Sequence, residues 1–198
     1  DASKYYKQAI EIAKEIGEKR NEGINLTNLG TIHQRLGKNE EAIFCLEQAL
    51  EIALEIGDKR NEGVNLGNLG IIYLEVGQYE KAIRTYKQSI QIAREIRNKR
   101  SEGINLGNLG DVFLTLNRLD EATEHLIQAI KICEVSMPLG AGVFRGSLAL
   151  VYATQNNHLE AFTNLEKGES LVTVSPSEHG KFLCKKAKVF HLLMQFEK

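Results

Sequence analysis

The chain has 198 residues, of which 42% are hydrophobic and 26% are charged, a composition typical of a folded protein. Its 25 basic and 26 acidic residues nearly cancel, and no concentrated basic stretch suited to nucleic acid is present. No apolar run approaches the roughly 18 residues that cross a bilayer, and the first residues do not resemble a signal peptide. We therefore expect a cytoplasmic protein that binds neither nucleic acid nor membrane.

Residues 1–16 form the first predicted element. Together with the residues up to position 20 they read "ASKYYKQAIEIAKEIGEKR", which is similar to "AIFCLEQALEIALEIGDKR" at residues 42–60. The chain therefore opens with the second half of a repeat, and we predict one helix there.

Three clear repeats follow, at residues 17–56, 57–96 and 97–135, and they align without a gap over nearly their whole length. Each carries a version of "NEGVNLGNLG", which recurs at an offset of 40 residues. Apolar residues stand at helical spacing in two stretches of each repeat, as in Leu66, Leu69 and Tyr73 and then in Ala82 and Tyr86. This pattern predicts two antiparallel helices per repeat.

The ends of these helices are also marked in the sequence. Asn61, like its counterparts in the other copies, is the predicted N-cap of the first helix. Glycines such as Gly57 and Gly77 are predicted to stop the helices in a left-handed conformation. Arg97 stands where such a glycine is expected, so we predict that the helix before it runs slightly further.

The last part of the chain follows the repeat less closely. Residues 136–172 form a divergent repeat, and residues 173–198 form a terminal half-repeat. Pro138 and three glycines interrupt the period at residues 134–146, which we expect to be the least regular junction. We predict a single array of about ten helices, and we expect it to be a piece of a longer protein.

The repeat resembles that of the tetratricopeptide repeat (TPR) family. The resemblance rests on Leu66-x-x-Leu69-Gly70-x-x-Tyr73 followed by Ala82-x-x-x-Tyr86. With its period of 40 residues, the chain is most similar to the repeats of kinesin light chains, Pins-type polarity adaptors and bacterial signalling proteins. The resemblance implies an all-α fold, a right-handed α-solenoid of antiparallel helix pairs that stack on their neighbours.

Motifs that carry chemistry are missing from the sequence. Cys45, Cys133 and Cys184 form no CxxC pair, and each lies in an apolar helical pattern, so we predict three buried, reduced thiols. The histidines have no metal-ligand spacing, and His33 takes the place of Tyr73, which indicates a packing role. We predict no metal site, no cofactor, no enzymatic activity and no small-molecule substrate.

In the TPR family the concave wall comes from one face of the first helix of each repeat. Projected onto this chain, the resemblance implies a ligand groove, and its predicted residues are Ile24, Asn28, Thr31, Gln34, Arg35, Val64, Asn68, Ile71, Leu74, Glu75, Ile104, Asn108 and Asp111. Gly67 and Gly107 are expected to lower the wall so that a ligand can approach. The lysines and arginines with which some TPR modules bind the acidic C-termini of chaperones are missing from this wall.

Asn28, Asn68 and Asn108 recur once per repeat on this face. An amide donates and accepts at once, so these side chains suit the backbone of an extended peptide, or they bond an adjacent helix and serve only packing. Asn25, Asn65 and Asn105 lie nearer the seam between repeats, where a structural role is favoured.

The sequence thus predicts a non-catalytic protein–protein interaction module, a scaffold or adaptor that binds a peptide or helix of another protein in its groove. The alternative is a sensor or regulatory segment of a larger bacterial signalling protein that also carries a kinase or ATPase domain.

Overall fold

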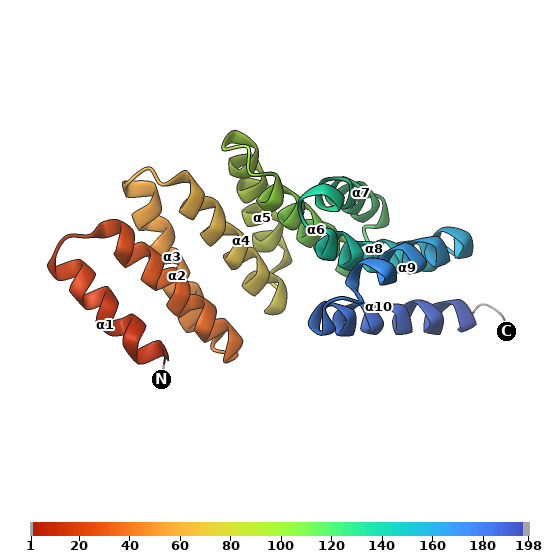
Figure 1. Cartoon of the computed structure of the whole chain (residues 1–198), viewed down its shortest axis with the longest axis horizontal. Helices are drawn as coiled ribbons and strands as arrows, with labels where there is room; N and C mark the ends of the chain where they lie inside the picture. Colours follow the sequence, from red (N-terminus) through yellow and green to blue (C-terminus); the bar gives the residue numbers. More distant parts are fainter. Residues whose placement is uncertain (1, 196–198) are drawn as a thin grey trace. The chain divides into compact units, whose positions relative to one another are not determined.

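A computed structural model of the protein describes residues 2–195, and these residues form ten α-helices and no β-strand. The chain divides into two compact units, residues 1–98 and residues 99–198. Within the described residues the all-α class is confirmed, and each helix packs antiparallel against the helix that follows it in its unit (Figure 1).

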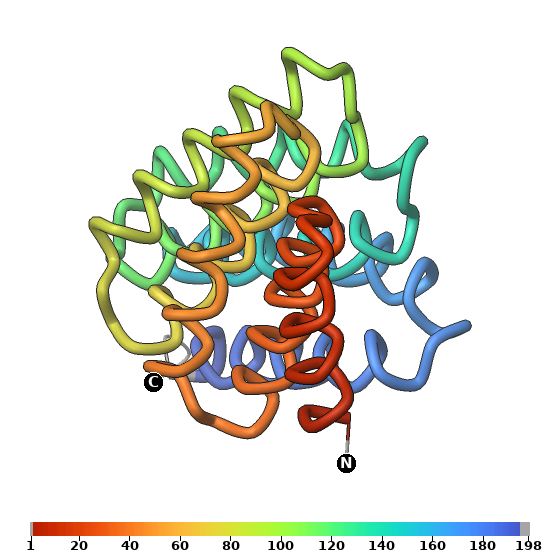
Figure 2. The backbone as a smooth tube through the Cα atoms, turned by 90° about the vertical axis from the view of Figure 1, so that its left-hand side faces the viewer, coloured from red at the N-terminus to blue at the C-terminus, as the bar shows by residue number. Residues whose placement is uncertain are grey.

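The first unit holds five helices. Their bounds are α1 (Ala2–Glu15), α2 (Lys19–Arg35), α3 (Asn39–Glu55), α4 (Lys59–Glu75) and α5 (Tyr79–Glu95). Viewed from the side of the N-terminus, α1 lies in front of α2 and α3 (Figure 2). Because α2 and α4 also contact each other, the first helices of successive repeats form one layer of the unit, with α3 and α5 packed against them.

The second unit holds the other five helices. Their bounds are α6 (Lys99–Thr115), α7 (Leu119–Ser136), α8 (Pro138–Thr154), α9 (His158–Val172) and α10 (Pro176–Gln195). As in the first unit, the first helices α6 and α8 touch each other, and α10 packs on both α8 and α9.

In the three clear repeats, glycine at one position of the first helix allows a large side chain of the second helix to pack against the backbone. A Cβ atom added to Gly70 would lie 2.7 Å from the ring of Tyr86, and one added to Gly110 would lie 2.7 Å from Leu126. Both large residues are fully buried. The small residue at this position therefore sets how closely the two helices of a repeat approach.

Most of the helices are followed by a residue in the left-handed conformation, as was predicted from the positions of the glycines. Gly77 has a φ of 73°, and the N–H of Gln78 donates to the carbonyl of Tyr73 at 2.8 Å, which is a Schellman motif. The prediction for Arg97 is wrong, because α5 ends at Glu95 and Arg97 itself adopts a φ of 55°. The hydrogen bonds that close this turn hold a non-glycine residue in the same conformation.

A further prediction about helix ends is wrong. The N-cap of α4 is Asp58 rather than Asn61: the Asp58 carboxylate accepts from the N–H of Asn61 at 3.1 Å, and the helix begins at Lys59. The segment 134–146 is almost wholly helical, because α7 continues to Ser136 and Pro138 starts α8, so that only Met137 lies between them. Proline fits there because the first turn of a helix does not need its N–H.

Candidate functional site

The predicted groove residues lie on the first helices of the repeats. None of them is buried: Ile24, Arg35, Val64 and Glu75 are exposed, and the other nine are half-buried. In the first unit these residues come from α2 and α4, and in the second unit they come from α6. Each set therefore remains accessible to a ligand.

Two hydrogen bonds join α2 to α4 along this face. Thr27 Oγ1 donates to Asn65 Oδ1 at 2.8 Å, and Gln34 Nε2 donates to Glu75 Oε1 at 3.1 Å. The residues predicted on these two helices are therefore brought together on one surface of the first unit, which we call the amide face. It consists of Ile24, Asn28, Thr31, Gln34, Arg35, Val64, Asn68, Ile71, Leu74 and Glu75.

The two sets of asparagines differ in what they bind. Asn65 is 1% exposed and accepts from Thr27, and Asn105 Nδ2 donates to the carbonyl of Ser101 at 2.9 Å. In contrast, the half-buried side chains of Asn28, Asn68 and Asn108 form no hydrogen bond with any residue within 2–195. These three amides consequently keep donors and acceptors available at the surface.

In the second unit other residues already occupy part of the predicted groove. Lys185 of α10 forms an ion pair with Asp111 Oδ2 at 3.3 Å and also bonds Ser147 of α8. The expectation that Gly107 leaves space for a ligand is wrong, because its missing Cβ would overlap the ring of Phe144 of α8. Sequence reasoning missed both residues, since they belong to the segments that follow the repeat least closely.

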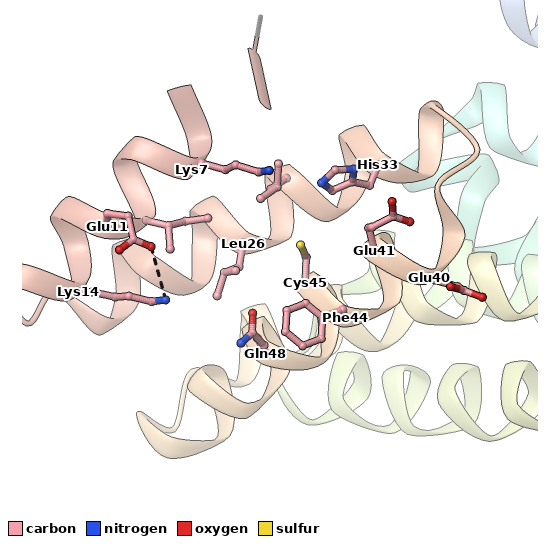
Figure 3. A pocket seen from close by; sticks show the side chains of 12 residues that line it. Lys7, Glu11, Lys14, Leu26, His33, Glu40, Glu41, Phe44, Cys45 and Gln48 are labelled. Carbon is pink, nitrogen blue, oxygen red and sulfur yellow. Dashed lines mark ion pairs between the residues drawn. The ribbon is translucent and has the colours of Figure 1, made fainter. Parts of the chain in front are cut away.

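The structure also contains a pocket that the sequence did not indicate. It has a volume of about 510 Å³ and is bounded by α1, α2 and α3 (Figure 3). His33 and Leu26 of α2 and Cys45 of α3 line it, and Lys7 of α1 extends over it. The signal that could have revealed it is the smaller His33 in the place of Tyr73.

The cysteines fall into two classes. Cys45 and Cys133 are buried, as predicted, and burial raises the pKa of Cys45 and raises the pKa of Cys133 to about 11. Both thiols are therefore protonated at neutral pH, which slows their reaction with electrophiles. Cys184 of α10 is exposed, so the prediction of three buried thiols is wrong for this residue.

Neither metal-binding clusters nor membrane-spanning helices are found where the structure is described. Residues 2–195 contain no group of three histidine, cysteine or carboxylate side chains that could hold a metal ion. No helix in this range has the length and hydrophobicity to cross a membrane.

Several solved structures resemble this chain in fold. A signal transduction ATPase with a tetratricopeptide repeat sensor from Pyrococcus horikoshii has 23% identity and a TM-score of 0.80, with 94% of this chain and 29% of that chain covered. A Rap protein complexed with competence and sporulation factor has 17% identity and a TM-score of 0.81, with 98% and 58% covered. Kinesin light chain TPR-like repeats from Podosopora anserina have 19% identity and a TM-score of 0.63, with 86% and 90% covered.

This chain thus spans less than two thirds of the length of the first two of these proteins. Among curated proteins, none matches the chain significantly. The model of the tetratricopeptide repeat family matches residues 1–55 and 61–134, which together make up more than half of the sequence. With its helix pairs and close Gly70–Tyr86 packing, the chain therefore belongs to the tetratricopeptide repeat family, and its fold is that of a TPR α-solenoid.

Proposed function

We propose that this chain is a non-catalytic interaction module, a scaffold or adaptor whose amide face binds a peptide or helix of another protein. The observation that carries the proposal is the absence of any hydrogen bond from Asn28 and Asn68 to another residue within 2–195. A packing role requires a partner for these amides, and the neighbouring Asn65 has one. The donors and acceptors of Asn28 and Asn68 are therefore available to a ligand at the surface.

The chemistry of the amide face suits an extended peptide. An asparagine side chain can donate to a backbone carbonyl and accept from a backbone N–H at the same time. Ile24 and Val64 are 38% and 39% exposed and add apolar contact area beside the amides. Arg35 and Glu75 add opposite charges, so the face does not select a strongly acidic or strongly basic ligand.

The Rap protein supports this reading, because its fold matches this chain and its structure contains a bound factor. In the second unit, the Asn108 amide likewise forms no hydrogen bond with a described residue, but the nearby Asp111 is already paired with Lys185. We infer that the first unit contributes most of the binding. A cytoplasmic location is also part of the proposal, because Cys45, Cys133 and Cys184 are all free thiols.

The test uses peptides selected against the immobilised chain from a displayed library. We expect Asn28→Ala combined with Asn68→Ala to weaken a selected peptide about fivefold to a hundredfold or more, because each lost hydrogen bond contributes about 0.5–1.5 kcal/mol. The melting temperature should stay the same or rise slightly, since these amides bond nothing within residues 2–195 and alanine favours a helix more than asparagine does.

Asn21→Ala is the matched control, because Asn21 is an exposed asparagine of the same helix outside the amide face. It should leave peptide affinity unchanged. Unchanged affinity in the double variant would remove the asparagines from the binding site. A lower melting temperature with proportionate loss of binding would indicate a structural role instead.

The second candidate is a sensor or regulatory segment of a larger signalling protein. The Pyrococcus horikoshii ATPase supports it, because this chain matches only 29% of that protein, whose name describes a TPR sensor. The sequence that flanks these residues in the full gene distinguishes the two functions. A kinase or ATPase domain there would favour the sensor, and its activity should then change when a peptide binds.

A further inference from the structure

The three clear repeats can be compared at one position of their first helices. In the second repeat this position is Tyr73, which lies between α3 and α5 in the first unit. Its hydroxyl donates to Glu47 Oε1 of α3 at 3.2 Å, and Lys81 Nζ of α5 lies 5.2 Å from its ring centre. The ring therefore fills the space over α4 between the two second helices.

The third repeat fills the same position in a similar way. Phe113 is 1% exposed, its ring lies 5.2 Å from the ring of His125, and the guanidinium of Arg118 lies 4.6 Å from it. A large aromatic residue with a cation over its face is thus present in both repeats.

The first repeat departs from this arrangement. His33 replaces the larger aromatic residue, Lys7 replaces Glu47, and Phe44 stands where the second repeat has Arg84. This part of the first unit contains the pocket of about 510 Å³ bounded by α1, α2 and α3. In the next repeat the larger ring of Tyr73 takes the position of His33 and bonds Glu47.

The lining of the pocket is suited to a ring. Ile10, Leu26, Leu29 and Cys45 are buried apolar residues of its walls, and the Phe44 ring lies at its edge with 62% of its surface exposed. Pockets of about 300–1,000 Å³ with apolar walls and a few polar groups are typical of small-ligand sites.

Several polar groups of the lining form no hydrogen bond or ion pair with a described residue, the Glu40 and Glu41 carboxylates among them, and two of these groups can bind an anion. His33 Nδ1 is shielded from solvent and forms no hydrogen bond, and Lys7 forms no ion pair. Both side chains extend over the space above the Cys45 sulfur (Figure 3). In contrast, Lys14 at the same pocket is paired with Glu11 at 3.8 Å. Lys7 is therefore the lysine of this lining that is free to bind an anion.

We propose that this pocket is a second binding site, which takes a small aromatic carboxylate. The ring of the ligand occupies the volume that Tyr73 fills in the next repeat, while Lys7 and His33 bind the carboxylate. The ligand is bound without chemical change, and no lining residue belongs to the amide face. This site is consequently independent of the proposed peptide-binding function.

The probe is 3-phenylpropionate, with uncharged 3-phenylpropionamide as the comparison. Native chain is alkylated with iodoacetamide at mildly alkaline pH, and modification of each cysteine is followed by mass spectrometry. The carboxylate should slow alkylation of Cys45 several-fold while exposed Cys184 reacts at an unchanged rate. Chemical shifts in NMR spectra give the affinities, and we expect the amide to bind about two- to fivefold more weakly.

Two variants, His33→Tyr and Lys7→Glu, replace a residue of the pocket with its counterpart in the second repeat. His33→Tyr should fill it and abolish protection of Cys45, with circular dichroism as the check on folding. His33→Phe, which copies the third repeat, serves the same purpose if the tyrosine variant does not fold. Lys7→Glu should weaken the carboxylate but not the amide, and Lys14→Glu, with the same charge change, should have a smaller effect.

The proposal is overturned if millimolar carboxylate fails to protect Cys45, if a folded His33→Tyr or His33→Phe chain still binds it, or if Lys7→Glu and Lys14→Glu weaken it equally. The Asn28→Ala and Asn68→Ala double variant should bind the carboxylate normally. Failure of the amide face and failure of this pocket are thereby distinguished.

Discussion

Replacing Gly70 with alanine tests the close packing that defines the repeat. The added methyl group would lie 2.7, 2.8 and 2.9 Å from three ring carbons of Tyr86. That ring is fully buried, so it cannot turn into solvent to make room. The helices α4 and α5 must therefore separate, or the ring must leave its preferred rotamer.

The expected magnitude follows from two opposing effects. Alanine favours a helix over glycine by about 0.8–1 kcal/mol, which stabilises the variant. Overpacking in a core costs about 1–3 kcal/mol, and all three ring contacts are too close for relaxation by a few tenths of an ångström. We expect Gly70→Ala to lower the free energy of unfolding by up to about 2 kcal/mol.

Gly63→Ala is the matched control in the same helix. A methyl group there would lie 3.2 Å from Ile92 Cγ2, a distance that a small shift relieves. The helix propensity should dominate, and we expect this variant to be as stable as the parent or up to about 1 kcal/mol more stable. The two variants should thus differ by about 1–3 kcal/mol.

Urea unfolding followed by both circular dichroism and tyrosine fluorescence measures this difference. Coincidence of the two transitions is needed, because repeat arrays can lose two-state behaviour. If Gly70→Ala proves as stable as Gly63→Ala, the close approach of α4 and α5 does not limit the size of the residue, and the packing argument fails.

The other predictions concern the connections between helices. Asp58→Ala should lower the free energy of unfolding by about 0.5–2 kcal/mol, because it removes the N-cap of α4. Glu18→Ala should change this free energy little, because Glu18 forms no side-chain cap on α2. Urea unfolding measures both variants. Although its burial acts to raise the pKa of Asp58, the N–H of Asn61 and the charge of Arg20 bring this pKa below its ordinary value. The stabilisation is therefore present above the ordinary pKa of about 3.9, and titration should show it lost as the pH falls through the folded-state value. Arg97→Gly should raise the melting temperature, because it relieves a left-handed φ of 55° in a non-glycine residue, while Gly57→Arg, at a φ of 69°, should lower it.

The repeated pattern was sufficient to predict the helices and their pairing. Residues at helical spacing such as Leu69, Tyr73 and Tyr86 are buried, and Gly77 ends its helix as a left-handed residue. These features are local, or they follow from a face that must be buried, and both leave a periodic trace in the sequence.

The errors arose where two local rules compete or where a contact is distant in sequence. Asp58 and Asn61 are both good N-caps, and the three-residue connection after α3 gives the place to Asp58. Whether Gly107 is open or closed depends on Phe144, which belongs to the divergent repeat. The ion pair between Lys185 and Asp111 joins residues 74 positions apart, and no spacing rule indicates it.

Internal repetition separates packing residues from candidate ligand residues without reference to any other protein. A residue that recurs for packing should have a recurring contact, and Gly70 and Gly110 each have one in Tyr86 and Leu126. Asn28 and Asn68 recur with the same regularity, yet their amides form no hydrogen bond within residues 2–195.

His33 departs from the repeat, so here it is the difference between repeats that needs a physical reason. If His33 served only packing, the first repeat should be as well filled as the second, where Tyr73 bonds Glu47. Instead a pocket is present, and the Nδ1 atom of His33 is buried without a hydrogen bond to any described residue. A buried polar atom without a partner lowers stability, and a ligand that bonds the imidazole would remove this cost. The His33→Tyr variant tests that proposal directly.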